Sequence, residues 1–159
     1  MHRKVRNPFD PSGYNCFGCS SGNPAGLKLS FTETDETVEA QWTPDSRYEG
    51  YINVLHGGII ATLLDEVAAW FVYVKLGTSG VTSELRVRYL HPVHISKGII
   101  NVKASLISQS GRKAIMKCCL YDGESKLCAE SETEFFVFPS EVAGRRFFYP
   151  GREAFLNDR

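Results

Sequence analysis

Residues 57–76 constrain the fold of this chain more than any other stretch. They are apolar at nearly every position, but two adjacent carboxylates, Asp65 and Glu66, stand at mid-length. The length of the stretch, and the glycines at 77 and 80 that follow it, predict one helix. A helix that is apolar all round has to be buried, whereas a buried carboxylate costs free energy unless it is paired or used. The stretch therefore predicts a central helix that carries a candidate functional site.

The composition is that of one domain without a charge bias. The chain has 159 residues, 43% of them hydrophobic, and its 18 Lys and Arg balance its 18 Asp and Glu. One domain is the default at this length. The absence of a basic patch argues against a nucleic-acid partner. The carboxylates at positions 65 and 66 argue against a membrane span, so we expect no membrane partner either.

The cysteines and the N-terminus bear on the cellular location. Five cysteines are spread over the chain without the spacing of a disulfide framework. Residues 1–6 are basic, but no apolar segment follows them, so we expect no secretory signal. Together these features predict a reduced, cytoplasmic protein.

Apolar and polar side chains alternate on both sides of the helix, as in half-buried strands. Two strands are predicted before the helix, at 27–32 and 37–42, with a turn at 34–36. Four are predicted after it, at residues 81–90, 99–108, 112–121 and 126–138. One helix and six antiparallel strands predict an α+β fold in which a curved sheet wraps around the helix. The side of the helix that the sheet leaves open needs another partner, and a second copy of the chain is the economical one.

Alternation also predicts which way the strand residues face. In the strand at 81–90, Val81, Leu85 and Val87 share the face toward the helix, and Thr82 and Arg88 share the opposite face. In the last strand the glutamates face away from the helix, opposite lysines of the strand before it. Opposite charges across an antiparallel pair indicate a solvated sheet face.

We expect three regions along the chain: a turn-rich N-terminal extension at 1–26, the sheet-and-helix domain at 27–138, and a tail rich in aromatic residues and arginine at 139–159. Two alternatives stay open for the tail. It packs on its own domain or on a partner subunit, or it forms a flap over a ligand in which Arg145 or Arg146 reaches a phosphate.

The extension contains the pair Cys16 and Cys19. Such a pair can be half of a zinc site or a redox pair. A zinc site needs about four ligands, and no second pair follows at a suitable spacing. A redox pair is typically flanked by a strand and a helix, and here the flanks are turn formers. We therefore interpret the cysteines as small buried residues that pack a loop, and we expect no metal.

Gly57 and Gly58 stand where the helix should begin. The first N–H groups of a helix have no internal partner and carry the positive end of the helix dipole. Glycine lets a ligand approach them closely, so the Gly57 N–H is a candidate for polarising a carbonyl group. The alternative is that the glycines only admit a tight loop. His56, just before them, is given a supporting role.

The two carboxylates differ in their surroundings on the helix. By the spacing of three and four residues, Asp65 shares its face with small residues: Gly58, Ala61, Thr62, Ala68 and Ala69. Glu66 shares its face with bulky ones: Ile59, Leu63, Trp70 and Tyr73. Asp65 thus has room for a ligand or for a second helix. Burial should raise the pKa of Asp65, and such a carboxylate can act as a general base or a nucleophile. The alternative is that both acids form ion pairs at an interface.

Three segments resemble a known family. His56-Gly57-Gly58 followed by Leu64-Asp65 resembles the motif of PaaI-type acyl-CoA thioesterases of the hotdog fold. Residues 80–93 resemble the strand that follows their helix, and residues 16–27 resemble an N-terminal extension found in a subgroup. The resemblance covers roughly residues 15–138 and leaves the tail out.

The resemblance implies the hotdog fold, a homodimer that is often doubled to a tetramer, and hydrolysis of an acyl-CoA thioester without a cofactor. In this family Gly57 would polarise the carbonyl and Asp65 would activate water or attack, with His56 nearby. As substrate-binding candidates we include five residues: Gly58, Asn53, Thr82, Glu66 and Arg88.

The spacing of two of these residues has a geometric consequence. Gly57 and Asp65 are eight positions apart, which is about 12 Å along a helix. One thioester carbon cannot lie about 3 Å from both. If both act, they come from different chains, and dimerisation becomes a condition of activity. The alternative function is a non-catalytic acyl-CoA-binding hotdog protein with a regulatory role.

Overall fold

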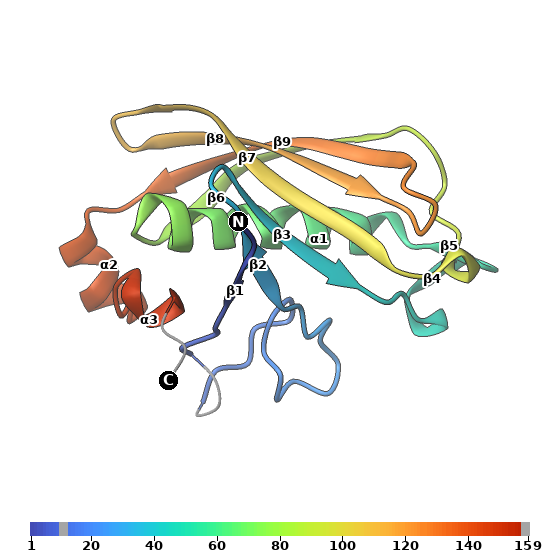
Figure 1. The fold of residues 1–159 in the computed structure, drawn as a ribbon, viewed down its shortest axis with the longest axis horizontal. Coiled ribbons are helices and arrows are strands. Elements are labelled where there is room, and N and C mark those ends of the chain that lie inside the picture. Colours follow the sequence, from blue (N-terminus) through green and yellow to red (C-terminus); the bar gives the residue numbers. More distant parts are fainter. Residues whose placement is uncertain (10–12, 157–159) are drawn as a thin grey trace.

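The computed structural model describes residues 1–9 and 13–156, and it confirms the predicted architecture of a curved antiparallel sheet around one central helix (Figure 1). The helix α1 spans Gly57–Phe71 and continues as a π-helical segment, Val72–Leu76. Gly77 then adopts the left-handed conformation, with a φ of 68°, which ends the helix. Among the described residues, no helix is long and apolar enough to cross a membrane.

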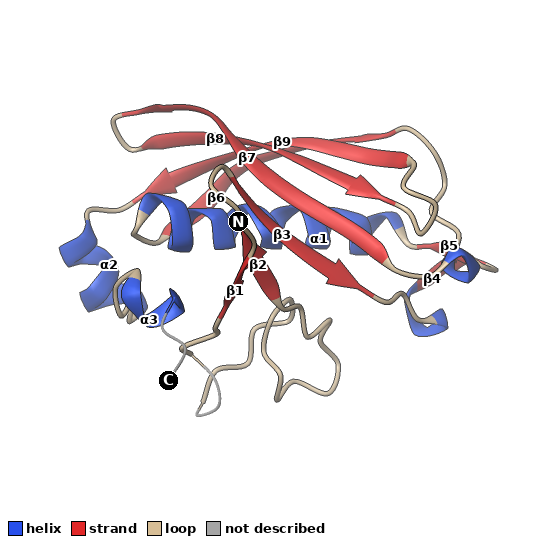
Figure 2. Cartoon of the chain, in the orientation of Figure 1, coloured by secondary structure: helices blue, strands red, loops and turns tan. Residues whose placement is uncertain are grey.

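Within residues 1–9 and 13–156, seven strands make the main sheet. They are β1 (Arg3–Val5), β2 (Phe31–Glu33), β3 (Thr37–Trp42), β6 (Gly80–Tyr89), β7 (Ile100–Ser110), β8 (Lys113–Tyr121) and β9 (Leu127–Val137). Their order is β1-β2-β3-β7-β8-β9-β6, and every neighbouring pair is antiparallel. A separate hairpin, β4 (Glu49–Tyr51) and β5 (Val54–Leu55), leads into α1 (Figure 2). Strand β6 therefore lies at one edge of the sheet.

The N-terminal end of the sheet differs from the prediction. The structure adds a strand, β1, within the segment expected to form turns, so the described part of the chain has seven strands in its main sheet where six are predicted. It pairs with β2, and Arg3 forms an ion pair with Glu33 across the two strands. That pairing connects residues far apart in the sequence, which no local pattern shows.

The strand predicted at 27–32 is shorter than expected. Leu27 and Leu29 are buried, as their alternation predicts, but β2 begins only at position 31. Lys28 between them has a φ of 55°. The amides of the two leucines bond to the carbonyls of Phe17 and Gly18 in the N-terminal loop, at 2.8 and 2.9 Å. The loop thus takes hydrogen bonds that a neighbouring strand would otherwise take.

The core lies between α1 and the inner face of the sheet. Leu63, Leu64 and Val67 of the helix are fully buried. The strand positions predicted to face inward are buried almost throughout: Ile100, Val102, Ala104, Ala114, Met116, Cys118, Leu120, Ala129, Ser131, Thr133, Phe135 and Val137. An exception is Leu106, which is 42% exposed. A bulge between Leu106 and Ser108 ends the regular alternation there.

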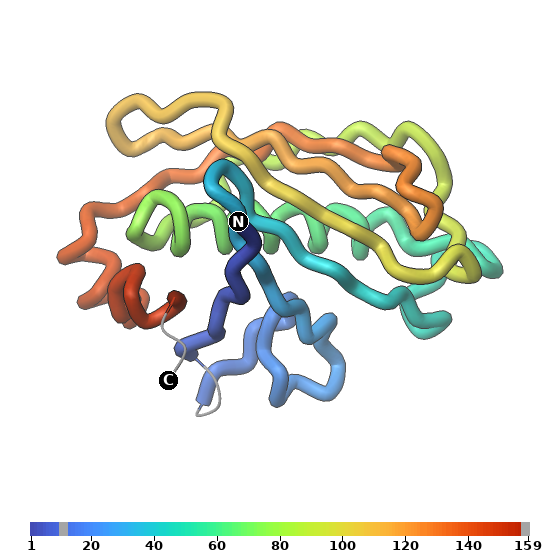
Figure 3. The backbone as a smooth tube through the Cα atoms, in the orientation of Figure 1, coloured from blue at the N-terminus to red at the C-terminus, as the bar shows by residue number. Residues whose placement is uncertain are grey.

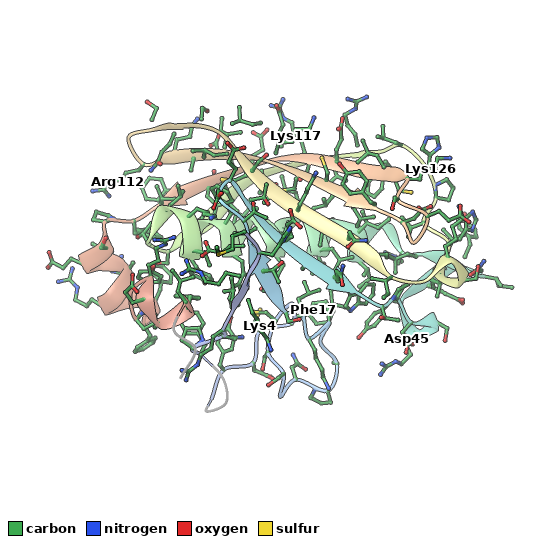
Figure 4. The ribbon with its side chains drawn as sticks, in the orientation of Figure 1. Lys4, Phe17, Asp45, Arg112, Lys117 and Lys126 are labelled. Atoms are coloured by element: carbon green, nitrogen blue, oxygen red, sulfur yellow. The ribbon has the colours of Figure 1, made fainter. Side chains whose placement is uncertain are left out.

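The outer face of the sheet is charged, as predicted. Lys113 pairs with Glu134 and Lys117 with Glu130, each at 3.2 Å. Lys117 projects from the upper surface of the sheet in Figure 4. These exposed ion pairs contribute little to stability, and they mark this face as solvated.

The chain's own ends cover the side of α1 that faces away from the sheet. Helices α2 (Ser140–Phe147) and α3 (Glu153–Leu156) lie below α1 in Figures 1 and 3, as does the N-terminal loop. Trp70 stacks on Phe31 with ring centroids 4.3 Å apart, and Tyr73 stacks on Phe155 at 5.5 Å. The helix face with the bulky side chains is therefore occupied within one chain.

The C-terminal tail packs on its own domain, which is one of the two alternatives. Phe155 is fully buried. The Tyr149 hydroxyl donates to the Tyr73 carbonyl at 2.8 Å, and the Arg152 guanidinium donates to the Val74 carbonyl at 2.7 Å. Arg145 is exposed beside Glu141 of the same helix. These contacts attach the tail to the C-terminal end of the central helix.

Candidate functional site

His56 caps the N-terminus of α1. Its Nδ1 accepts a hydrogen bond from the Gly58 amide at 2.8 Å. A Cβ on residue 58 would lie 3.0 Å from that nitrogen, so glycine is the residue that fits under the ring. Because Nδ1 is an acceptor, a neutral His56 carries its proton on Nε2. The exposed side of the ring is then a hydrogen-bond donor.

The amide of Gly57 remains available as a donor. Beyond Gly58, the amides of Ile59 and Ile60 bond to the His56 carbonyl at 3.0 and 3.1 Å. None of the described residues accepts a hydrogen bond from the Gly57 N–H. The Gly57 carbonyl accepts from the Tyr89 hydroxyl of β6 at 2.7 Å. The helix start thus offers a free N–H whose peptide is held in place by the edge strand.

Tyr89 was not among the predicted site residues. By alternation, Tyr89 shares the face toward the helix with Leu85 and Val87 in the strand predicted at 81–90. That position could have identified Tyr89 as a site residue. Its ring also passes 3.5 Å from the point where a Cβ on Gly57 would be. It therefore acts on the helix start rather than on a reacting atom.

Asp65 lies further along the same helix and is hydrogen-bonded to β6. The Thr82 hydroxyl donates to Asp65 Oδ1 at 2.7 Å. Burial raises the pKa of Asp65, and the hydrogen bond from Thr82 opposes this rise without cancelling it. Asp65 is thus a half-buried carboxylate, more basic than an exposed one, with one oxygen held by a hydroxyl.

The prediction that Thr82 faces away from the helix is wrong, because β6 contains a bulge. Its register against β9 shifts between Thr82, which pairs with Phe135, and Glu84, which pairs with Glu134. The extra residue, Ser83, bonds to Glu134 on the outer face. A bulge places two residues of one strand opposite one residue of the other. The residues before it therefore face the other way from what strict alternation predicts.

Glu66 points away from Asp65, although the two are adjacent in sequence. Its Oε1 accepts from the Trp70 indole at 3.1 Å and lies 3.5 Å from the Cys16 sulfur. Burial raises the pKa of Glu66 to about 7. The side chain therefore lies against the N-terminal loop, apart from the open face of the helix.

Two other candidates also lie apart from Asp65. The Asn53 amide donates to the Ser96 hydroxyl at 2.9 Å and accepts from the Ser96 N–H at 2.8 Å, so it joins the β4–β5 hairpin to the segment before β7. Arg88 is on the outer face of the sheet, paired with Glu130 at 2.9 Å. The structure thus brings together Asp65 with Thr82, and His56 with Gly57 and Gly58.

The surface around Asp65 is open in a single chain. On α1 the small residues near it, Ala61, Thr62 and Ala69, are partly exposed. On the edge strand, Thr82 is exposed and Tyr89 is 54% exposed. A hollow of about 720 Å³ lies elsewhere, over β2, β3 and β7, and includes no residue of α1. One chain therefore supplies the reactive groups without enclosing them.

Comparison with known proteins gives three findings. Residues 52–129 match the model of the thioesterase superfamily. A structure of a Bacillus halodurans protein, determined with CoA, has a TM-score of 0.62 at 26% identity, covering 72% of this chain and 76% of that one. A thioesterase from Haemophilus influenzae has a TM-score of 0.65 at 21% identity, covering 74% and 84%, and this likeness shows the fold alone.

Among curated proteins, one named "Putative esterase SSO1253" from Saccharolobus solfataricus is 30% identical over 86 residues, covering 54% of this chain and 56% of that protein. An uncharacterized protein of Schizosaccharomyces pombe is 33% identical over 109 residues, covering 62% and 58%. The chain thus spans a little over half the length of the curated relatives it matches.

Proposed function

We propose that the chain hydrolyses the thioester bond of an acyl-CoA, on the premise that it has the hotdog fold and that its residues 52–129 match the thioesterase superfamily. The observation that carries the proposal is Asp65, a half-buried carboxylate held by Thr82 on the open face of α1. The structure of the Bacillus halodurans protein with CoA supports acyl-CoA as the substrate class.

In the proposed reaction the Gly57 N–H donates to the thioester carbonyl oxygen and stabilises the negative charge that develops on it. The ionised Asp65 takes a proton from a water molecule, whose oxygen bonds to the carbonyl carbon. The carbon–sulfur bond then breaks, and the proton goes to the thiolate of CoA. The raised pKa of Asp65 makes it a better proton acceptor than an exposed aspartate. Direct attack by Asp65 is the other form of the same proposal.

The His56 ring caps the same helix start through Nδ1, and we assign its Nε2–H as the second donor to the carbonyl oxygen. Gly58 contributes by admitting the His56 ring. The Thr82 hydroxyl fixes one oxygen of Asp65, which leaves the other for water. Thr82 thus acts as a positioning residue in this scheme, and Tyr89 does so for Gly57.

The distance along the helix supports a site made by two chains. Gly57 and Asp65 are separated by about 12 Å of helix, and both hydrogen bonds to β6 hold them in that arrangement. We propose that Asp65 of one chain acts with Gly57 of the partner subunit. The small residues around Asp65 and the unpaired edge of β6 support a two-fold contact at this face. Doubling of the dimer to a tetramer stays a prediction, as does a cytoplasmic location.

A panel of acyl-CoA thioesters of different chain length tests the proposal, with release of free thiol as the readout. Continuous release by the wild type, and its loss in Asp65→Asn, would support it. Asp35→Asn, in an exposed turn, is the matched control and should keep full activity. Acyl-CoA that raises the melting temperature without turnover would overturn hydrolysis and favour the non-catalytic acyl-CoA-binding function.

A further inference from the structure

Two thiols and a carboxylate meet outside the candidate active site. The sulfurs of Cys16 and Cys19 and a carboxylate oxygen of Glu66 all lie within 4.8 Å of one another. Cys16 Sγ and Glu66 Oε1 are 3.5 Å apart. The cysteines belong to the N-terminal loop and the glutamate to α1. This Cys16–Cys19–Glu66 cluster therefore joins segments that are 50 residues apart.

The loop is shaped to bring its sulfurs to the helix. A turn closes where the Ser20 amide bonds to the Cys16 carbonyl at 3.1 Å. A Cβ on Gly18 would lie 2.5 Å from the Glu66 carboxylate carbon. Only glycine at position 18 therefore lets the carboxylate approach the pair of thiols. Figure 4 shows the neighbouring Phe17 at the bottom of the view, in the loop below α1.

Polar groups and burial surround the two sulfurs. The Tyr14 hydroxyl lies 3.2 Å from the Cys19 sulfur, within hydrogen-bond reach. Cys19 is only 2% exposed, and Cys16 is partly buried. The cluster is thus a polar site with little access to water on the Cys19 side.

The carboxylate of the cluster has no cationic side chain paired with it. Over residues 1–9 and 13–156, no lysine or arginine forms an ion pair with Glu66. By contrast, the buried Glu33 is contacted by Arg3, Lys75 and Arg152. Ionised ligands buried without compensation are costly, and a bound cation would provide that compensation.

We propose that Cys16, Cys19 and Glu66 bind a zinc ion, with water in the fourth position. Zinc takes thiolate and carboxylate ligands in tetrahedral geometry, and soft thiolates select it over magnesium or calcium. Two thiolates at about 2.3 Å from one ion are roughly 3.8 Å apart, so small side-chain rotations bring these atoms into place. The Tyr14 hydroxyl orients the Cys19 thiolate from outside the coordination sphere.

A zinc ion at this position attaches the N-terminal loop to α1, one residue from Asp65 in the sequence. The sequence raises half of a zinc site as one interpretation of the two cysteines, but it shows no further ligand beside them, which is why the sequence alone predicts no metal. The third ligand is on a helix that folds against the loop. The inference does not depend on the proposed hydrolysis, since it concerns the other side of α1.

The first test is the metal content of the full chain, produced with a tag that contains no histidine and without added zinc. Elemental mass spectrometry should find close to one zinc per chain. A chelator should release it and expose two further thiols to a thiol reagent. Cobalt added to the chelated wild type should give the absorption of cobalt–thiolate bonds. These measurements need no variant, so a folding defect cannot obscure them.

Variants then assign the ligands. Cys16→Ser and Cys19→Ser should abolish the cobalt–thiolate absorption or halve it. Glu66→Gln should keep it but weaken zinc binding by about tenfold or more. Cys119→Ser, which changes a partly buried cysteine on β8, is the matched control and should bind zinc as the wild type does. Circular dichroism checks that each variant is folded.

The proposal is overturned by wild-type protein that binds no zinc after reconstitution, or by unchanged binding in the Cys16 and Cys19 variants. Isolation of the chain with a Cys16–Cys19 disulfide that persists in a thiol-reducing buffer would overturn it as well. Loss of acyl-CoA hydrolysis has no bearing on these readouts, because they measure metal and thiols only.

Discussion

Asp65 and Glu66 are adjacent residues that both carry a carboxylate, but α1 directs their side chains into different surroundings. Asp65 lies on the open face, among small side chains and with one hydroxyl donor from Thr82. Glu66 lies on the covered face, against an indole and two thiols. One residue is about 100° of rotation on a helix. That rotation separates a carboxylate that can meet a ligand from one that holds the loop.

The two faces are also completed differently. The covered face is filled by the chain's own ends. Tyr73 stacks on Phe155 there, and Glu33, which is 3% exposed, forms an ion pair with Lys75. The open face ends at the edge strand β6, where Tyr89 is 54% exposed. Side chains of the same chain fill the covered face, whereas the open face is free to bind a ligand or a second copy of the chain. Activity should therefore be sensitive to changes on the open face, and stability to changes on the covered face.

The largest expected effect is on catalysis. Asp65→Asn should lower kcat/KM for a cleaved acyl-CoA by about 10²- to 10⁴-fold, because the amide cannot accept the proton from water. Glu66→Gln, one residue away, should keep activity within roughly an order of magnitude when the protein is folded. Steady-state thiol release measures both. Equal losses in the two variants would contradict the division of the helix into two faces.

The next effect is on stability. Glu33→Gln should lower the free energy of unfolding by about 3 kcal/mol, because it leaves Arg3 and Lys75 without their buried partner. Urea denaturation at neutral pH measures it. Burial raises the pKa of Glu33, but the hydrogen bonds from Lys75 and Arg3 outweigh burial, so the pKa is lowered overall. The stability that Glu33 contributes should therefore be present above the ordinary pKa of a glutamate. It should be lost as the pH falls through the lowered pKa of the folded state.

Glu39→Gln, on the neighbouring strand β3 and partly exposed, is the control for that measurement. Its effect should stay within about 0.5 kcal/mol. A Glu33→Gln variant as stable as this control would show that the covered face does not rely on its buried charges.

A smaller effect concerns the pH dependence of activity. Activity should fall as the pH drops through the raised pKa of Asp65, because the base must be ionised. The Thr82 hydroxyl stabilises the charged form, so Thr82→Val should move this acid limb to higher pH and lower activity about tenfold below it. Thr82→Ser, which keeps the hydroxyl, should restore the wild-type profile. A Thr82→Val profile that coincides with the wild type would show that Thr82 does not act through Asp65.

The smallest effect is at the helix start. Tyr89→Phe removes the hydrogen bond to the Gly57 carbonyl and should cost about 1 kcal/mol of stability. Because that bond also positions the Gly57 amide, kcat should fall more than KM rises. Tyr51→Phe is the control, since Tyr51 is 83% exposed. An unchanged kcat in Tyr89→Phe would remove Tyr89 from the set of positioning residues.

Much of this architecture follows from local patterns. An apolar helix of this length has to be central, and the alternation in β7, β8 and β9 identifies their inward residues because side chains of a strand point alternately to its two faces. The small-residue face around Asp65 follows from helical spacing in the same way. These features depend on residues within a few positions of one another.

Other features depend on partners that are distant in the sequence. A bulge in β6 exists only relative to β9, and it turns Thr82 toward Asp65. Strand β1 exists because β2 offers it an edge. No periodicity within a segment records either pairing, so alternation alone placed Thr82 on the wrong face.

Helical spacing alone is enough to predict a central helix with two carboxylates, and to predict that the carboxylate among small residues has room for a ligand. The partner of each carboxylate follows only from the packed chain: a hydroxyl of the edge strand for Asp65, and the thiols of the N-terminal loop for Glu66. This is because a side chain's direction is set by the local backbone. Its partners are set by how distant segments pack to bury apolar surface.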